Sequence, residues 1–138
     1  MTLLDAYALV AFLIGGPSSA TVRGLLREGD TAVTTANLAE TLDVAERRYA
    51  IPVLRSMEFL DPLLDGPLTT LALDVRIAVR AATIRSQHYD RAKRDLSIGD
   101  SILIASAGPA DRIVTADAAV LAVAGRLQLA TVALADKG

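Results

Sequence analysis

The sequence predicts an α/β fold, a three-layer α/β/α sandwich around a mostly parallel sheet of about five strands. Two observations support this expectation. Short apolar runs of strand length alternate along the chain with longer amphipathic runs of helical length, which is typical of successive strand–helix units. The short runs are apolar almost throughout, as expected for parallel strands that helices cover on both faces.

The first third of the chain predicts two strand–helix units with an extra helix between them. The apolar run Thr2–Leu4 is a strand candidate, and Ala6–Ile14 follows as a helix until a Gly-Gly-Pro sequence breaks it. Ser18–Glu28 carries apolar residues at helical spacing, so it predicts a second helix. The β-branched run Thr31–Thr35 predicts the second strand, and Asn37–Tyr49 then has the apolar period of a helix.

The middle of the chain continues the same alternation. A proline at position 52 suits the first turn of a helix, which predicts a helix over Val53–Leu60. Leu68–Leu73 predicts the third strand, and Asp74–His88 predicts a long, basic amphipathic helix. Asp100–Ala107 is expected to form a short helix, because Ser97 is a candidate cap just before it.

The last part of the chain predicts two strands with a helix between them. Arg112–Thr115 and Thr131–Leu134 have the composition of strands, and Ala118–Ala124 is expected to be helical. No internal repeat or long linker interrupts the pattern. Residues 1–138 are therefore expected to form one domain.

The composition excludes several classes of protein. Hydrophobic residues make up 52% of the chain and charged residues 22%, which argues against disorder. With no cysteine and a single histidine, His88, the chain excludes a disulfide scaffold, thiolate metal centres and a multi-histidine zinc site. The apolar stretch Ala6–Gly16 is too short to span a bilayer and lacks the basic start of a signal peptide. We therefore expect a cytoplasmic protein outside the membrane.

Positive charge is concentrated in one segment of an otherwise slightly acidic chain. The net charge of the whole chain is −2, whereas Arg76–Arg94 holds six basic residues and one acidic residue, a local charge of +5. Within it, Arg85, Arg91 and Arg94 are candidates for contacts with nucleic-acid phosphates. The alternative is an ordinary solvated helix face. His88, at the end of the same predicted helix, is interpreted as structural.

Four acidic residues follow predicted strands or begin the helices after them. Asp5 comes directly after the first strand and Asp117 two residues after the fourth, whereas Glu40 and Asp100 lie in the first turns of helices. Parallel strands place their carboxyl ends at one edge of the sheet, and ligands bind at that edge. We therefore expect the four carboxylates to lie close together. Each of them also has an ordinary explanation as a helix cap.

Two of these acids match the capping-box pattern, Asn37 with Glu40 and Ser97 with Asp100. Capping alone does not explain why four carboxylates should gather, since their charges repel and raise one another's pKa. A divalent cation removes that repulsion, and oxygen ligands without cysteine or histidine favour Mg²⁺ or Mn²⁺. The pattern predicts an acidic metal site, with capping as the alternative for each residue.

The four acids occur in an ordered set of short motifs. These are Leu3-Leu4-Asp5-Ala6, Asn37-Leu38-Ala39-Glu40, Leu96-Ser97-Ile98-Gly99-Asp100-Ser101 and Val114-Thr115-Ala116-Asp117. Over almost the whole chain, this set resembles the PIN-domain ribonucleases and, at this length, the VapC-type toxins of toxin–antitoxin pairs. The resemblance implies a Rossmann-like PIN fold, Mg²⁺- or Mn²⁺-dependent cleavage of RNA, a cognate antitoxin and a homodimer.

The same resemblance implies a site made of Asp5, Glu40, Asp100 and Asp117. We expect the three aspartates to hold the metal, and Glu40 to act as a further ligand or as a base that positions the attacking water. Thr115 stands two residues before Asp117. It either orients a carboxylate or a metal-bound water through its hydroxyl, or is simply a β-former at the end of a strand.

The segment Ile51–Leu64 is apolar around most of its circumference. It is either a helix buried on both sides or a surface for the helices of a partner, such as the antitoxin. Three other functions compete with the toxin hypothesis. They are a receiver-like regulatory domain with aspartates around Mg²⁺, a DNA-directed nuclease with the same metal centre, and a catalytically inactive binding domain.

Overall fold

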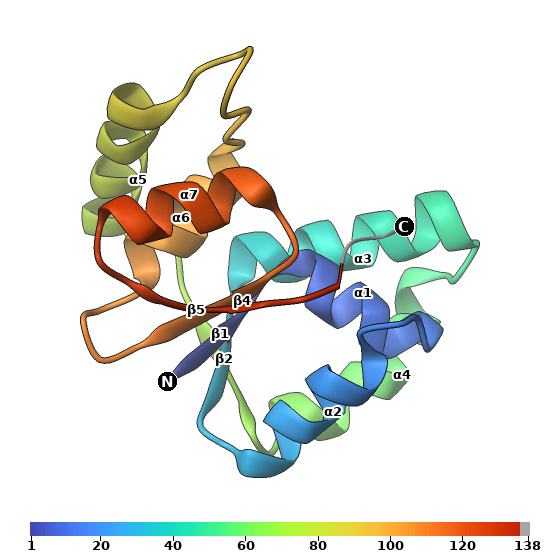
Figure 1. Cartoon of the computed structure of the whole chain (residues 1–138). Helices are drawn as coiled ribbons and strands as arrows, with labels where there is room; N and C mark the ends of the chain where they lie inside the picture. Colours follow the sequence, from blue (N-terminus) through green and yellow to red (C-terminus); the bar gives the residue numbers. More distant parts are fainter. Residues whose placement is uncertain (136–138) are drawn as a thin grey trace.

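A fully parallel sheet runs through the middle of the molecule (Figure 1). The computed structural model describes residues 1–135. Within that range the sheet has five strands, in the spatial order β3–β2–β1–β4–β5. Their bounds are β1 Thr2–Leu4, β2 Thr31–Thr34, β3 Leu68–Leu71, β4 Arg112–Thr115 and β5 Ala130–Ala133. Each neighbouring pair is parallel, which confirms the predicted type of sheet.

Helices cover both faces of this sheet, which confirms the three-layer α/β/α sandwich. Their bounds are α1 Ala6–Ile14, α2 Ser19–Glu28, α3 Thr35–Tyr49, α4 Val53–Leu64, α5 Val75–His88, α6 Ile98–Ser106 and α7 Ala118–Arg126. Helices α5, α6 and α7 share one hydrophobic cluster with the sheet, and α1, α2 and α4 share the other. Helix α3 contacts both α1 and α6, so it lies where the two layers meet.

The strands supply side chains to both clusters because successive residues of a strand point to opposite faces. In β1, Leu3 faces α5–α7 and Leu4 faces α1, α2 and α4. Ile113 and Val114 of β4 divide in the same way. All four side chains are fully buried. Burying each one contributes about 1.5–3 kcal/mol to folding. The continuous apolar runs of the sequence therefore reflect burial on both faces.

Helix α3 begins at Thr35 rather than at the predicted Asn37. The Thr34 hydroxyl accepts a hydrogen bond from the Asn37 backbone N–H at 3.0 Å, so Thr34 is the N-cap. Strand β2 leads into this cap without a loop. The predicted helix start was wrong because threonine is favoured both in strands and at helix N-caps.

Helix α4 continues past its predicted end at Leu60 and ends at Leu64. Pro62 signals a helix end in the sequence, because proline lacks an N–H and clashes with the preceding turn. In the structure Leu63 and Leu64 pack against the cluster that α1 and α2 share, and this burial outweighs the proline. Thr2–Leu4, Ala6–Ile14 and Arg112–Thr115 match their predicted bounds, and the remaining elements differ by one or two residues at their ends.

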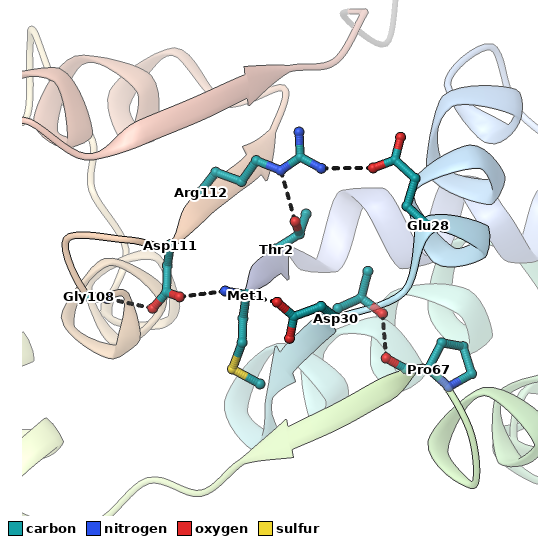
Figure 2. A network of polar contacts seen from close by, with 9 residues as sticks. Met1, Thr2, Glu28, Asp30, Pro67, Gly108, Asp111 and Arg112 are labelled. Carbon is teal, nitrogen blue, oxygen red and sulfur yellow. Dashed lines mark hydrogen bonds and ion pairs between the residues drawn. The ribbon is translucent and has the colours of Figure 1, made fainter.

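The amino ends of the strands are joined by paired charges (Figure 2). The Met1 ammonium donates to Asp111 Oδ1 at 2.7 Å. Arg112, the first residue of β4, donates to Thr2 Oγ1 at 2.8 Å and to Glu28 Oε2 at 3.0 Å. These contacts tie β1, β4 and the end of α2 together at the amino edge of the sheet.

Across residues 1–135, no single helix has both the length and the apolar composition needed to cross a bilayer. Helices α1 and α2 reach those values only as a pair, and they are bent by 108° relative to each other.

Candidate active site

The four predicted acids line one cavity at the carboxyl edge of the sheet. The cavity has a volume of about 420 Å³. Asp5 follows β1, Asp117 follows β4, Glu40 lies on α3 and Asp100 lies on α6, and all four form part of its wall. Four segments that are far apart in the sequence thus bring their carboxylates to the same space, as the parallel topology predicted.

Asp5 and Asp117 both cap the helix that follows their strand. Asp5 Oδ1 accepts a hydrogen bond from the Ala8 backbone N–H at 2.8 Å. Asp117 Oδ1 accepts from the N–H groups of Ala119 and Val120 at 2.8 and 3.1 Å. These bonds confirm the capping interpretation for both residues. A carboxylate has two oxygens, so a cap on Oδ1 leaves Oδ2 available to face the cavity.

Asp100 also caps its helix, through the capping box predicted with Ser97. The Ser97 N–H donates to Asp100 Oδ2 at 3.1 Å, and the Asp100 N–H donates to Ser97 Oγ at 3.0 Å. The corresponding box of Asn37 and Glu40 does not exist, because Thr34 is the cap of α3.

Glu40 is held by a side chain instead. Its Oε1 accepts a hydrogen bond from Asn37 Nδ2 at 3.3 Å. The same oxygen lies close to the start of α6, since a methyl group built on Gly99 would be 3.5 Å from it. Glu40 therefore reaches across from α3 toward the helix that carries Asp100.

Burial and like charge shift the two central carboxyl groups in the same direction. Asp5 is 7% exposed. Burial raises its pKa from 3.8 to about 6, against hydrogen bonds from Thr115 and Ala8, and the charges of Asp100 and Asp117 add to the increase. The pKa of Asp100 is likewise raised to about 6, mainly by burial and also by the charges of Asp117 and Glu40, against hydrogen bonds from Ser97. The four acids form one electrostatically coupled group.

Thr115 connects the Asp5 carboxylate to the backbone of Asp117. Its side chain is fully buried at the end of β4. Its hydroxyl accepts a hydrogen bond from the Asp117 backbone N–H at 3.0 Å and, by donating to the Asp5 carboxylate, lowers the pKa of Asp5. A β-former without a hydroxyl would fill the strand position but would not connect Asp5 to Asp117.

The four acidic side chains at this edge suit a hard divalent cation. A positive charge would relieve the repulsion between their carboxylates, and carboxylate oxygens are ligands that Mg²⁺ and Mn²⁺ prefer. Across residues 1–135, however, no three acidic, histidine or cysteine side chains are gathered closely enough to form a ready-made metal site.

The cavity is also lined by residues that were not predicted as part of the site. They are Tyr7, Val10, Val44, Arg48 and Tyr49. The helical period contains a signal for some of them, because Val44 and Arg48 follow Glu40 at intervals of four residues and so share its face of α3. Tyr7 and Val10 come from α1, whose packing against α3 is not evident from the sequence.

The basic residues proposed from the sequence lie elsewhere. Arg85 Nε donates to the Leu96 carbonyl at 2.9 Å, and Arg94 Nε donates to the His88 carbonyl at 3.0 Å. Arg91 is exposed in the segment between α5 and α6. None of the three arginines is among the described residues that line the acidic cavity.

Comparison with known proteins gives a family match and several similar folds. A family model described as PIN domain matches residues 2–138. No curated protein matches the chain. Similar solved structures include a DNA-bound VapBC from Salmonella typhimurium, with 18% identity, 96% of each chain covered and a TM-score of 0.68.

Two further structures have comparable similarity. FitAcB from Neisseria gonorrhoeae has 23% identity over 95% of this chain and 96% of its own, with a TM-score of 0.66. A toxin-antitoxin complex from Klebsiella pneumoniae has 18% identity over 85% of this chain and 87% of its own, with a TM-score of 0.61. At these identities the similarity concerns the fold.

Proposed function

Since this chain belongs to the PIN domain family, we propose that it is a Mg²⁺- or Mn²⁺-dependent endoribonuclease and the toxin of a toxin–antitoxin pair. One observation carries the proposal. Four carboxylates from four separate elements line a single cavity at the carboxyl edge of the sheet. PIN domains generally use divalent metal ions, and this donor set suits such ions.

The proposal gives a role to each of the four acids and to Thr115. Asp5, Asp100 and Asp117 would hold the metal. A bound divalent ion would lower the pKa of a water molecule and neutralise charge on the phosphate oxygens. Glu40, held by Asn37 through a hydrogen bond of 3.3 Å, is placed to accept a proton from the attacking water or to act as a fourth ligand. Thr115, which accepts from the Asp117 backbone N–H, would orient the Asp5 carboxylate.

Asp5→Asn provides the direct test of this nuclease activity. Asparagine retains an oxygen that can cap α1, so the fold should be kept while one ligand charge is lost. Wild type and variant are incubated with a panel of single-stranded and structured RNAs and DNAs in Mg²⁺, Mn²⁺ or EDTA. We expect cleavage of RNA by the wild type that EDTA and the substitution both abolish. Equal cleavage by Asp5→Asn would point to a contaminating ribonuclease and contradict the assignment.

The same panel separates the proposal from the DNA-directed alternative, because cleavage of DNA in preference to RNA would favour the latter. A receiver-like regulatory domain is not supported by the strand order. The receiver order is 2-1-3-4-5, whereas this sheet has the order β3–β2–β1–β4–β5.

We propose that the partner antitoxin covers an apolar surface on α4 and the neighbouring cavity. Helix α4 buries Ser56 and Leu60 on one side, but Leu54 is 80% exposed and Phe59 48% exposed on the other. The interpretation of this helix as buried on both sides was therefore wrong. Beside α4 lies a mostly apolar cavity of about 370 Å³, whose lining residues are Phe12, Arg23, Leu26, Arg27, Leu63 and Pro67.

Co-expression tests the toxin role separately from the nuclease chemistry. We expect a cytoplasmic homodimer that arrests growth when expressed alone and is neutralised by the product of a neighbouring gene. Leu54→Glu, on the exposed side of α4, should weaken that complex and leave cleavage by the free protein unchanged. A protein that is harmless alone and binds no product of a neighbouring gene would contradict the toxin role, even if RNA cleavage is observed.

A further inference from the structure

The acidic cavity extends along one face of α3 and changes character along it. Glu40, Val44 and Arg48 all line it and are spaced four residues apart. At a helical rise of 1.5 Å per residue, the Cα atoms of Glu40 and Arg48 are about 12 Å apart. The cavity thus has a carboxylate end at the sheet and a cationic, aromatic end at the carboxyl terminus of α3.

The charge of Arg48 is not neutralised by the protein. The neighbouring Arg47 pairs with Asp43 at 3.3 Å, one turn earlier on the helix. Arg48, by contrast, forms no ion pair with any of residues 1–135. Its guanidinium lies 5.8 Å from the centre of the Tyr49 ring, and Tyr49 is 40% exposed. An unpaired guanidinium beside an exposed ring therefore forms part of the cavity wall.

We propose that Arg48 binds a phosphate of the RNA adjacent to the one that is cleaved, and that Tyr49 stacks on an unpaired base. The inference rests on the proposed ribonuclease function and adds two residues, Arg48 and Tyr49, that would hold the RNA strand outside the metal site. Guanidinium groups bind phosphate through paired hydrogen bonds. Aromatic rings in single-strand sites stack on bases that are free of a duplex.

A cation at the position of Arg48 would help a negatively charged RNA strand to bind in this cavity. The four acids repel phosphates, so a strand needs a cation outside the metal site to hold it in the cavity. The Cα atoms of Arg48 and Glu40 are about 12 Å apart along α3, so we assign Arg48 to a neighbouring phosphate rather than to the reacting one. Of the basic residues within 1–135, Arg48 is the one that lines this cavity.

The test measures RNA binding directly, in an Asp5→Asn background that leaves the RNA intact. The probe is a fluorescein-labelled single-stranded RNA, titrated by fluorescence anisotropy at several salt concentrations. Arg48→Gln should weaken binding about tenfold and reduce the slope of log K against log salt by about 0.7, the value for one phosphate contact on a single strand. Arg47→Gln is the matched control, because it removes an equal charge from the next position, and it should change affinity less than about twofold.

Tyr49 is tested with the same probe and with an RNA duplex. Tyr49→Ala should weaken binding of the single strand about five- to tenfold without changing the salt slope, and Tyr49→Phe should restore it. Binding of the duplex should be the same for wild type and Tyr49→Ala. Cleavage is measured in protein that keeps Asp5. There, Arg48→Gln should raise KM while kcat stays within about twofold, since Arg48 is not assigned to the reacting phosphate.

Equal effects of Arg48→Gln and Arg47→Gln would overturn the inference, as would equal loss of duplex and single-strand binding in Tyr49→Ala. These outcomes are independent of the test of the nuclease. If the wild type cleaves RNA but the two arginine variants behave alike, the ribonuclease function stands and the single-strand site fails. If the variants differ but no RNA is cleaved, the cavity binds RNA and the hydrolytic function fails.

Discussion

The charged groups at the two edges of the sheet differ in whether they are paired. At the amino edge, positive and negative groups pair, with the Met1 ammonium 2.7 Å from Asp111 and Arg112 3.0 Å from Glu28 (Figure 2). At the carboxyl edge four carboxylates line one cavity, and none of them forms an ion pair within residues 1–135. The paired charges at the amino edge stabilise the folded state, whereas the unpaired carboxylates at the carboxyl edge lower its stability.

The same residue type shows the difference in its pKa. At the amino edge, the hydrogen bond from the Met1 ammonium holds the pKa of Asp111 below its usual value. At the carboxyl edge, burial raises the pKa of Asp5 to about 6. Unpaired charge that costs stability is typical of functional sites. The contrast supports the carboxyl edge as the candidate active site.

The largest expected effect is on cleavage, and it separates the acids of the two edges. Asp100→Asn removes a proposed metal ligand and should reduce the rate of RNA cleavage about 1000-fold or more, which corresponds to roughly 4 kcal/mol in the activation free energy. Asparagine can still accept from the Ser97 N–H, so α6 should keep its cap. Glu28→Gln removes an equal charge at the amino edge and should leave the rate unchanged. Similar losses in both variants would mean that the two edges do not differ in function.

The next effect is on stability, where Asp5→Asn should stabilise the metal-free protein. Between pH 3.8 and about 6 the folded state keeps a proton on Asp5 that the unfolded chain has released, so stability falls as pH rises through this range. At neutral pH the cost is at most about 3 kcal/mol, at about 1.4 kcal/mol per pKa unit. Denaturant unfolding should show Asp5→Asn to be the more stable protein near neutral pH, with the difference vanishing in acid.

Asp111→Asn provides the comparison with the opposite sign. Because the folded pKa of Asp111 is lowered, its contribution to stability is present above the usual carboxyl range and is lost as pH falls through that lowered value. The variant should therefore be less stable than wild type near neutral pH. A stabilising effect of Asp111→Asn, or a destabilising effect of Asp5→Asn, would contradict the electrostatic difference between the edges.

Metal addition should relieve the repulsion at the carboxyl edge. Mn²⁺ at about ten times its Kd should raise the free energy of unfolding by about 1.4 kcal/mol. The gain should disappear below pH 6, where protons compete for Asp5 and Asp100. Thermal unfolding with and without Mn²⁺ measures this gain in stability. Asp5→Asn is the matched variant, and Mn²⁺ should not change its stability. An equal gain in that variant would place the metal elsewhere.

The smallest effect is expected for the exposed ion pair at the amino edge. The side chains of Arg112 and Glu28 are 40% and 65% exposed, so water screens their interaction. Glu28→Gln should cost at most about 1 kcal/mol of stability, and the loss should shrink in high salt. Urea titrations at low and high salt measure the difference. A loss that does not depend on salt would show that Glu28 acts through packing rather than through charge.

Local patterns were sufficient to predict the order of the elements and the four acids. Each strand is a short apolar run, and Asp5 and Asp117 stand one and two residues after two of them. The rule that parallel strands share a carboxyl edge then predicts their meeting without coordinates. The same local reasoning placed the cap of α3 at Asn37 instead of Thr34, because strand and cap preferences overlap in the run of threonines.

Surfaces that depend on contacts between distant segments were not predictable in this way. The sequence pointed to Arg85 and Arg94 for RNA, since charge density is visible along the chain, and their role in RNA binding stays a prediction. In the structure Arg85 Nε donates to the Leu96 carbonyl before α6, and Arg94 Nε donates to the carbonyl of His88, the last residue of α5. Arg48 and Tyr49 line the acidic cavity, although no sequence motif marks them.

The sequence by itself determined the layered α/β architecture and the carboxylates at the ends of its strands, because residues two to four positions apart set helical and extended periods. The tertiary structure alone decided that α1 and α3 pack side by side, and so which side chains close the cavity opposite those acids. The physical reason is that this packing joins segments about thirty residues apart, whose apolar faces have many possible partners until the whole core forms.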